Sequence, residues 1–275
     1  MTLEARRWTV GWSATFRAML ARDLRVLRRQ LGQFVLRTIM QPLLFVFVFA
    51  YVFPKIGQGF RGPGSGPGSF TTVLVPGLIA VAINFQGIQA VALPLVQEFS
   101  VSKEIEDRVL APVPVWMIGL EKIVAGALQS ILAALVVFPI VYVVHAHRAA
   151  PHIHVHDWFL FAVAIVFASL LASAGGLFIG TVIDPRKITL LFSVIVIPIT
   201  FLGCVYYPWA TLSPIPWLKY AVLLNPLVYM TEALRASLTP QLPHMAMWAF
   251  MLALVGGTAA LGFVALRTFS RRVVT

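Results

Sequence analysis

Charged residues are scarce in this chain. Asp, Glu, Lys and Arg make up 11% of its 275 residues, whereas 59% are hydrophobic. Soluble domains contain about 25% charged and about 45 to 50% apolar residues, so this composition excludes an ordinary soluble protein. The single cysteine, Cys204, excludes an intramolecular disulfide framework. We infer an integral membrane protein.

Sequence motifs for nucleotide binding and hydrolysis are also missing. The chain has no Gly-x-x-x-x-Gly-Lys-Ser/Thr phosphate loop, no HExxH, no GxSxG, and no GxGxxG placed between a strand and a helix. We therefore expect no catalytic residue and no cofactor bound by this chain. In particular, the chain is not expected to hydrolyse ATP by itself.

Six hydrophobic runs are long enough to cross a bilayer core, which requires about 20 helical residues. Runs such as 131–144 do not alternate in polarity, which excludes a β-barrel and favours helices. We predict an all-α membrane protein with six transmembrane helices, at roughly 34–53, 71–96, 115–144, 158–183, 188–208 and 245–266.

The central portions of these runs contain no Asp, Glu, Lys, Arg or His. Ion-coupled carriers usually place ionisable groups there, so the energy for any uphill transport is expected to come from a separate protein. The second run carries neutral amides instead, at Asn84, Gln86, Gln89 and Gln97, the last three on roughly one helical face. These amides can join helices by hydrogen bonds, which is their usual role, or line a translocation path.

Small residues form a stripe along the fourth run. They are Ser169, Ser173, Gly175, Gly176 and Gly180. Such a stripe favours close packing against another helix.

The distribution of Lys and Arg indicates the orientation. Sixteen of the 21 fall in segments that are cytoplasmic if the N-terminus is inside, and cytoplasmic segments are enriched in these residues. We therefore predict that both termini are cytoplasmic. The first run follows about 32 residues and lacks a small-residue cleavage site, so it is expected to remain in the mature protein.

Residues 1–32 are predicted to form a cytoplasmic interface helix. Within residues 12–31, apolar side chains recur every three or four positions, a pattern typical of a helix in the inner headgroup layer. Asp23 lies on the apolar side, where it either pairs with Arg22 or Arg37 or faces protein. The opposite arc carries five arginines: Arg17, Arg22, Arg25, Arg28 and Arg29.

Two regions outside the bilayer core are unusual. Prolines divide residues 209–243 into short pieces with Trp and Tyr anchors, which predicts two half-helices in an extracytoplasmic re-entrant region. The loop before the fourth run contains His152, His154 and His156, which are weak candidates for a metal site. The alternatives are a pH-sensitive outer gate and an ordinary solvated loop.

A charged segment lies between the second and third runs. Residues 97–112 have helical spacing, and prolines end the pattern at Pro112 and Pro114. An inner loop must be polar in any case. A short helix fixed at both ends by transmembrane helices can nevertheless transmit a push from a soluble partner.

Three segments resemble one known family, the membrane permeases of type-2 ABC transporters, which are mostly exporters. Residues 104–114 with 119–122 are similar to the family's coupling segment. Residues 201–208 resemble its aromatic and proline ending of the fifth helix, and residues 224–235 resemble its Asn-Pro-Leu-x-Tyr and Glu-Ala-Leu-Arg signature. The likeness spans nearly the whole chain as a single permease domain, residues 1–275. Cys204 stands where the family more often has Gly or Ser, an apolar replacement that we expect to be tolerated.

The resemblance implies two permease subunits, expected to be identical, with two cytoplasmic ATPase subunits that bind ATP and Mg. It implies contacts with membrane lipids and none with nucleic acid. It also implies roles for particular residues. Coupling to the ATPase would fall to Glu98, Lys103, Glu104, Glu106, Asp107 and Arg108; the substrate path to Asn84, Gln86, Gln89, Thr200 and Tyr206; and the outer gate, held by mutual hydrogen bonds, to Asn225, Tyr229, Glu232 and Arg235.

The expected function is that of a permease in an ATP-driven exporter of a hydrophobic or amphiphilic substrate, such as a drug or lipid, in the cytoplasmic membrane of a prokaryote. The expected path has aromatics and amides but no fixed charges, which favours a substrate of low charge density. Export of a polysaccharide or lipid-linked glycan is one alternative. A membrane-embedded metal-binding enzyme or scaffold is another.

Overall fold

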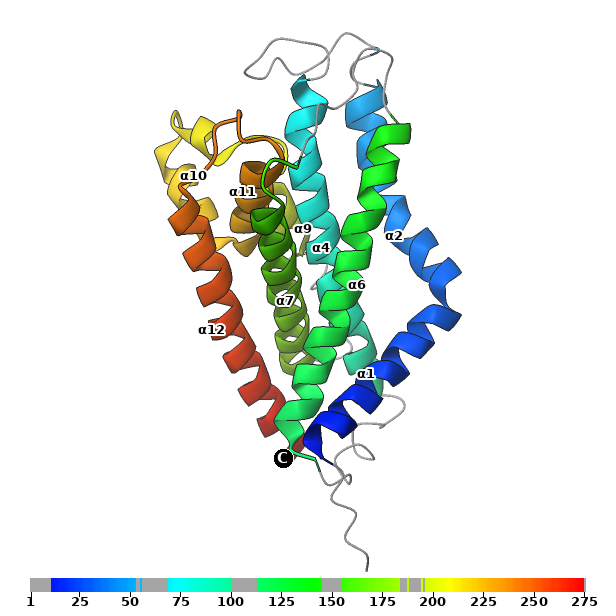
Figure 1. The fold of residues 1–275 in the computed structure, drawn as a ribbon. Coiled ribbons are helices and arrows are strands. Elements are labelled where there is room, and N and C mark those ends of the chain that lie inside the picture. Colours follow the sequence, from blue (N-terminus) through cyan, green and yellow to red (C-terminus); the bar gives the residue numbers. More distant parts are fainter. Residues whose placement is uncertain are drawn as a thin grey trace, which may run out of the picture.

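The computed structural model describes residues 11–52, 55, 69–99, 113–144, 155–183, 187, 194 and 196–274. Every regular element in these residues is a helix, and none is a strand (Figure 1). The predicted all-α class is therefore confirmed for this part of the chain.

Four long apolar helices form the body of the bundle (Figure 1). Each has the length and composition needed to cross a membrane. They correspond to the second, third, fourth and sixth predicted runs. They are α4 (Ser69–Gln97), α6 (Val115–Val143), α7 (Trp158–Val182) and α12 (Met247–Val274).

The first predicted run is helical but shorter and bent away from the bundle. α1 (Trp12–Arg29) and α2 (Leu31–Val46) meet at Gln30 and diverge at an angle, and the π-helix η1 (Phe47–Val52) continues α2. Gln30 leaves the helical conformation, with φ −110° and ψ 17°, while its backbone N–H still bonds the carbonyls of Val26 and Leu27. The predicted N-terminal helix is thus present, and its position in the headgroup layer stays a prediction.

The first residues of the fifth predicted run, 188–208, lie mostly outside the described residues. The helix in this run ends earlier than predicted. Its described helix is α9 (Ile197–Phe201). From Leu202 the chain is non-helical, and Cys204 adopts φ 52°, in the left-handed region that favours glycine. The Cys204 side chain is fully buried. A small residue is therefore favoured here by the backbone conformation as well as by the apolar surroundings.

Short helices fill the region that follows. They are η5 (Trp209–Leu212), α10 (Pro216–Ala221), η6 (Val222–Leu224) and α11 (Pro226–Leu238). Pro216 and Pro226 occupy the first helical positions, where the missing N–H is not needed. α11 packs against α4, α7 and α12, and most of its side chains are buried. The predicted short pieces are present, and their entry into the outer leaflet stays a prediction.

α4 lies at the centre and contacts α2, α6, α7 and α11. α7 packs closely against it: a Cβ on Gly176 would lie 2.8 Å from the carbonyl oxygen of Ile88, and one on Gly180 would lie 3.0 Å from the Cα of Ala92. Backbones can come this close only where side chains are absent. The packing interpretation of the small-residue stripe is confirmed at these two glycines.

This contact predicts that Gly176→Ala destabilises the permease by about 1 to 3 kcal/mol, because the added methyl group forces two backbones apart. Gly256→Ala on α12 is the matched control, since nothing lies within 4 Å of its added Cβ. Thermal unfolding in detergent should separate the two variants. Equal unfolding temperatures would contradict the packing.

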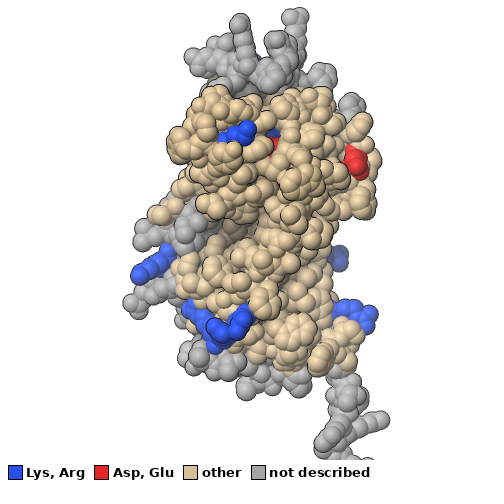
Figure 2. All heavy atoms as spheres, turned by 90° about the vertical axis from the view of Figure 1, so that its left-hand side faces the viewer, with Lys and Arg blue, Asp and Glu red and all other residues tan. Residues whose placement is uncertain are grey.

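Charged side chains are unevenly spread over the surface. Figure 2 shows a face on which most atoms belong to uncharged residues, with Lys and Arg gathered mainly toward one end. This end is at the bottom of Figure 1, where the start of α1 and the chain's C-terminus lie. The candidate functional site lies nearer to this end.

Candidate functional site

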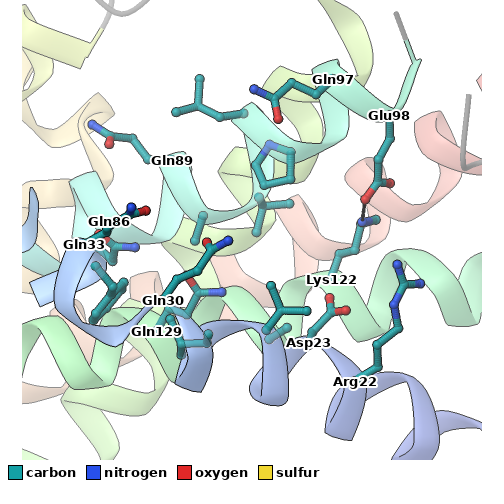
Figure 3. A pocket seen from close by; sticks show the side chains of 18 residues that line it. Arg22, Asp23, Gln30, Gln33, Gln86, Gln89, Gln97, Glu98, Lys122 and Gln129 are labelled. Atoms are coloured by element: carbon teal, nitrogen blue, oxygen red, sulfur yellow. Dashed lines mark hydrogen bonds and ion pairs between the residues drawn. The ribbon is translucent and has the colours of Figure 1, made fainter. Parts of the chain in front are cut away.

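A cavity of about 640 Å³ lies between α1, α2, α4 and α6 (Figure 3). It exists because α1 and α2 diverge at Gln30 and leave space beside α4. Its wall mixes apolar side chains, including Leu27, Phe34 and Pro94, with many polar ones. The polar lining residues are Arg22, Asp23, Gln30, Gln33, Gln86, Gln89, Gln97, Glu98, Lys122 and Gln129.

Three glutamines of α4, predicted to share one helical face, line this cavity. Gln86, Gln89 and Gln97 share the face that borders it. Gln86 also joins two helices, because the Thr38 hydroxyl of α2 donates a hydrogen bond to its Oε1 at 3.3 Å. The hydrogen-bond interpretation therefore applies to Gln86. A role of Gln86, Gln89 and Gln97 in a translocation path stays a prediction.

A buried ion pair closes one end of the cavity. Lys122 Nζ of α6 lies 2.7 Å from Glu98 Oε1, and the two side chains are 6% and 11% exposed. Figure 3 places Asp23 at the same end of the cavity. Glu98 lies two residues before the undescribed segment 100–112, and Lys122 lies ten residues after it, within α6. The pair therefore links the start of the predicted coupling segment to α6.

Phe99 connects the same point to the end of α12. Its ring lies 6.3 Å from that of Phe269 and 4.6 Å from the Arg272 guanidinium. Arg272 in turn donates hydrogen bonds to the carbonyls of Thr181 and Ile183 at the end of α7. The ends of α4, α7 and α12 are thus tied together beside the predicted coupling segment.

The other predicted coupling residues cannot be placed. Lys103, Glu104, Glu106, Asp107 and Arg108 lie outside the described residues. Of the predicted coupling set, the structure places only Glu98. Their role stays a prediction.

The predicted substrate-path residues are not all brought together. Gln86 and Gln89 line the cavity, whereas Asn84, Thr200 and Tyr206 are not among the described residues that border it. Asn84 is buried, and its Nδ2 has no hydrogen-bond partner among the described residues. The Thr200 hydroxyl bonds to the carbonyl of Val196. The Tyr206 ring packs on the aromatic rings of α2 and α9, with centroids 6.1 and 6.2 Å away.

The predicted interface arginines lie on α1, none of whose residues is buried. Arg17 and Arg25 bond to backbone carbonyls one turn earlier, those of Ser13 and Ala21. Arg22, Arg28 and Arg29 are exposed, and Arg22 borders the cavity. Asp23 also lines the cavity, and the choice between pairing with an arginine and facing protein stays open.

At the other end of the molecule, Glu232 and Arg235 of α11 form a fully buried ion pair. Arg235 Nη1 lies 2.5 Å from Glu232 Oε1, and both side chains are 0% exposed. The Glu232 carboxylate also accepts the backbone N–H groups of Trp209 and Met245, at 3.1 and 2.7 Å. Arg235 Nη2 donates to the carbonyl of Cys204 at 3.1 Å. The pair therefore ties α11 to three distant segments.

Asn225 and Tyr229 bond to backbone groups instead of to the ion pair. Asn225 Nδ2 donates to the carbonyl of Ile199 at 2.6 Å, while its Oδ1 caps α11 by accepting the N–H of Leu227. The Tyr229 hydroxyl donates to the carbonyl of Leu223 at 2.8 Å. Mutual hydrogen bonds are thus present for Glu232 and Arg235, whereas Asn225 and Tyr229 hold the same region through hydrogen bonds to the backbone.

The histidine-rich loop contributes little to the described structure. His152 and His154 lie outside it. The backbone N–H of His156 bonds to the carbonyl of Ser237, and Asp157 caps α7 through the N–H of Leu160. The described residues contain no group of three or more His, Cys, Asp or Glu able to hold a metal ion.

Lys122 and three glutamines of the cavity were not among the predicted site residues. Gln129 is a half-buried amide in the strongly apolar α6, whereas Gln30 lies at the bend between α1 and α2 and Gln33 lies just after it. A lone amide inside an apolar run is a signal that could have identified Gln129. Gln30 and Gln33 are recognisable only once the bend is known.

Comparison with known proteins agrees with this architecture. The family profile of the ABC-2 type transporter matches residues 14–239. The chain is also 26% identical, over 200 residues, to the inner membrane transport permease YadH of Escherichia coli (strain K12), covering 72% of this chain and 74% of that protein. YadH of Shigella flexneri matches to the same extent. The matched profile extends over most of the chain, which therefore belongs to the ABC-2 type transporter family.

Proposed function

We propose that this protein is the permease of an ATP-driven exporter that moves a hydrophobic or amphiphilic substrate across the inner membrane. Family membership implies an ABC ATPase as partner. Two copies of each subunit, with the permease termini in the cytoplasm, complete the proposed complex. ATP and Mg bind the ATPase.

The cavity beside α4 is the observation that carries this proposal. It combines apolar walls with amide side chains and is open enough for Gln30, Gln33 and Gln97 to be exposed. Its volume of about 640 Å³ falls in the usual range of ligand sites, about 300 to 1,000 Å³. A site with both kinds of wall suits a molecule with an apolar part and a polar part.

The end of the cavity at the Glu98–Lys122 pair is also suited to receive movement from the ATPase. The Glu98–Lys122 pair links the end of α4, where segment 100–112 begins, to α6, which follows the segment. A push on this segment by the ATPase would move both cavity walls together. The Glu232–Arg235 network is proposed to hold the outer gate.

Charge reversal in the coupling segment tests the proposal. With Glu106→Lys and Asp107→Lys combined, the ATPase should no longer co-purify with the permease, because two attractive charges become repulsive. Pull-down from solubilised membranes measures this. Arg267→Met, an exposed α12 residue at the same end, is the control. Undiminished ATPase association together with undiminished transport would contradict the coupling role.

A further inference from the structure

Five of the six glutamine amides in the cavity are available to a ligand. Gln30, Gln33, Gln89, Gln97 and Gln129 make no side-chain hydrogen bond within the described part of the chain. We propose that this cavity binds the uncharged, hydroxyl-rich head group of an amphiphile whose apolar chain lies against α1 and α2. This inference rests on the proposed function and specifies the substrate class.

The amides select the kind of head group. Each carboxamide offers two N–H donors and a carbonyl acceptor, so a group of amides can bind hydroxyls as donors and as acceptors at once. Polar groups close to an apolar bilayer are costly without hydrogen-bond partners, and a hydroxyl-rich head supplies many. A purely apolar ligand would leave these amides without partners.

The charges of the cavity select against ionic heads. Arg22 and Lys122 are balanced by Asp23 and Glu98, so the lining has no net charge. Lys122 is bound to Glu98 at 2.7 Å. An anionic head would be repelled by two carboxylates, and a cationic head would be repelled by two basic groups. A neutral head avoids both repulsions.

The apolar part of the wall selects for an attached chain. Val26, Leu27 and Phe34 line the cavity from the α1 and α2 side, and Leu93 and Pro94 line it from α4. An alkyl chain placed along these residues would be removed from water. A free sugar would gain nothing from them.

Photo-crosslinking of the purified permease, without ATPase, in phosphatidylcholine nanodiscs tests this inference. Three decyl probes with a diazirine in the chain would carry a maltoside, a phosphate or a trimethylammonium head. The maltoside probe should label peptides of α1, α2, α4 and α6 saturably, about tenfold more than the other two, which corresponds to one or two hydrogen bonds. Unlabelled decyl maltoside should compete, and free maltose should not.

Gln89→Leu combined with Gln129→Leu should reduce the maltoside labelling about tenfold. Gln241→Leu, an exposed residue outside the cavity, should leave it unchanged. Equal labelling by the three heads of the wild-type protein, or competition by free maltose, would overturn the inference. Because no ATPase is present, that failure would leave ATP-driven export intact; labelling without any ATP-dependent transport would instead refute the proposed function alone.

Discussion

Arg235→Met should destabilise the permease by about 3 to 5 kcal/mol, because it leaves the buried Glu232 carboxylate without its counter-charge. Both side chains are fully buried, and Nη2 of Arg235 also holds the carbonyl of Cys204. In thermal unfolding, a loss of this size corresponds to a midpoint lower by roughly 10 °C. Glu232→Met should have an effect of similar size, because it leaves the Arg235 charge buried.

The double variant Glu232→Met with Arg235→Met distinguishes the cost of an unpaired buried charge from the cost of altered side-chain packing. It should recover much of the loss, since a buried pair replaced by apolar side chains of similar volume is often neutral. Recovery is expected to be incomplete, because the N–H groups of Trp209 and Met245 lose their acceptor. Arg28→Met, on the exposed side of α1, is the control. Single variants as stable as this control would contradict the structural role of the pair.

Lys122→Met should uncouple ATP hydrolysis from transport in the permease–ATPase complex. The pair with Glu98 connects the end of α4, where segment 100–112 begins, to α6, so its loss should let the segment move without moving both helices. We expect transport per ATP hydrolysed to fall at least about tenfold, because a break in the mechanical link lets hydrolysis proceed without movement of the cavity walls. The ratio is measured in proteoliposomes that contain both subunits.

The charge exchange Glu98→Lys with Lys122→Glu should restore the ratio of transport to hydrolysis. Arg267→Met lies at the same end of the molecule on an exposed face of α12 and should leave the ratio unchanged. A purely structural role would lower transport and hydrolysis equally. An unchanged ratio in Lys122→Met would therefore refute the coupling role of the pair.

The sequence predicted the helices that depend on local patterns. Length and hydropathy located α4, α6, α7 and α12, because a helix that spans a bilayer must be apolar along its length. The early end of the fifth helix was not predicted. It depends on tertiary contacts, such as Leu227 of α11 beside Gly203, and on the left-handed conformation of Cys204. Neither is visible in a hydropathy pattern.

The sequence predicted the parts of the site that depend on one helix, but not those that depend on contacts between distant segments. The shared face of Gln86, Gln89 and Gln97 follows from helical spacing alone. The contribution of Gln30 and Gln33 follows from the bend at Gln30, which apolar periodicity does not reveal. Glu232 and Arg235 are three residues apart on one helix, so their pairing was predictable, whereas their backbone partners come from distant segments.

In the proposed function, a separate ATPase moves these helices. Pulsed electron spin resonance between labels at Gln33→Cys and Gln97→Cys tests it most directly, because both residues are exposed and line the cavity while the native Cys204 is buried. Labelled subunits diluted with unlabelled ones report the distance across one cavity. Trapping the complex with ATP and vanadate should shift this distance, whereas the same nucleotide should leave the permease alone unchanged. An identical distance distribution in the nucleotide-free and trapped complexes would contradict movement of these helices by the ATPase.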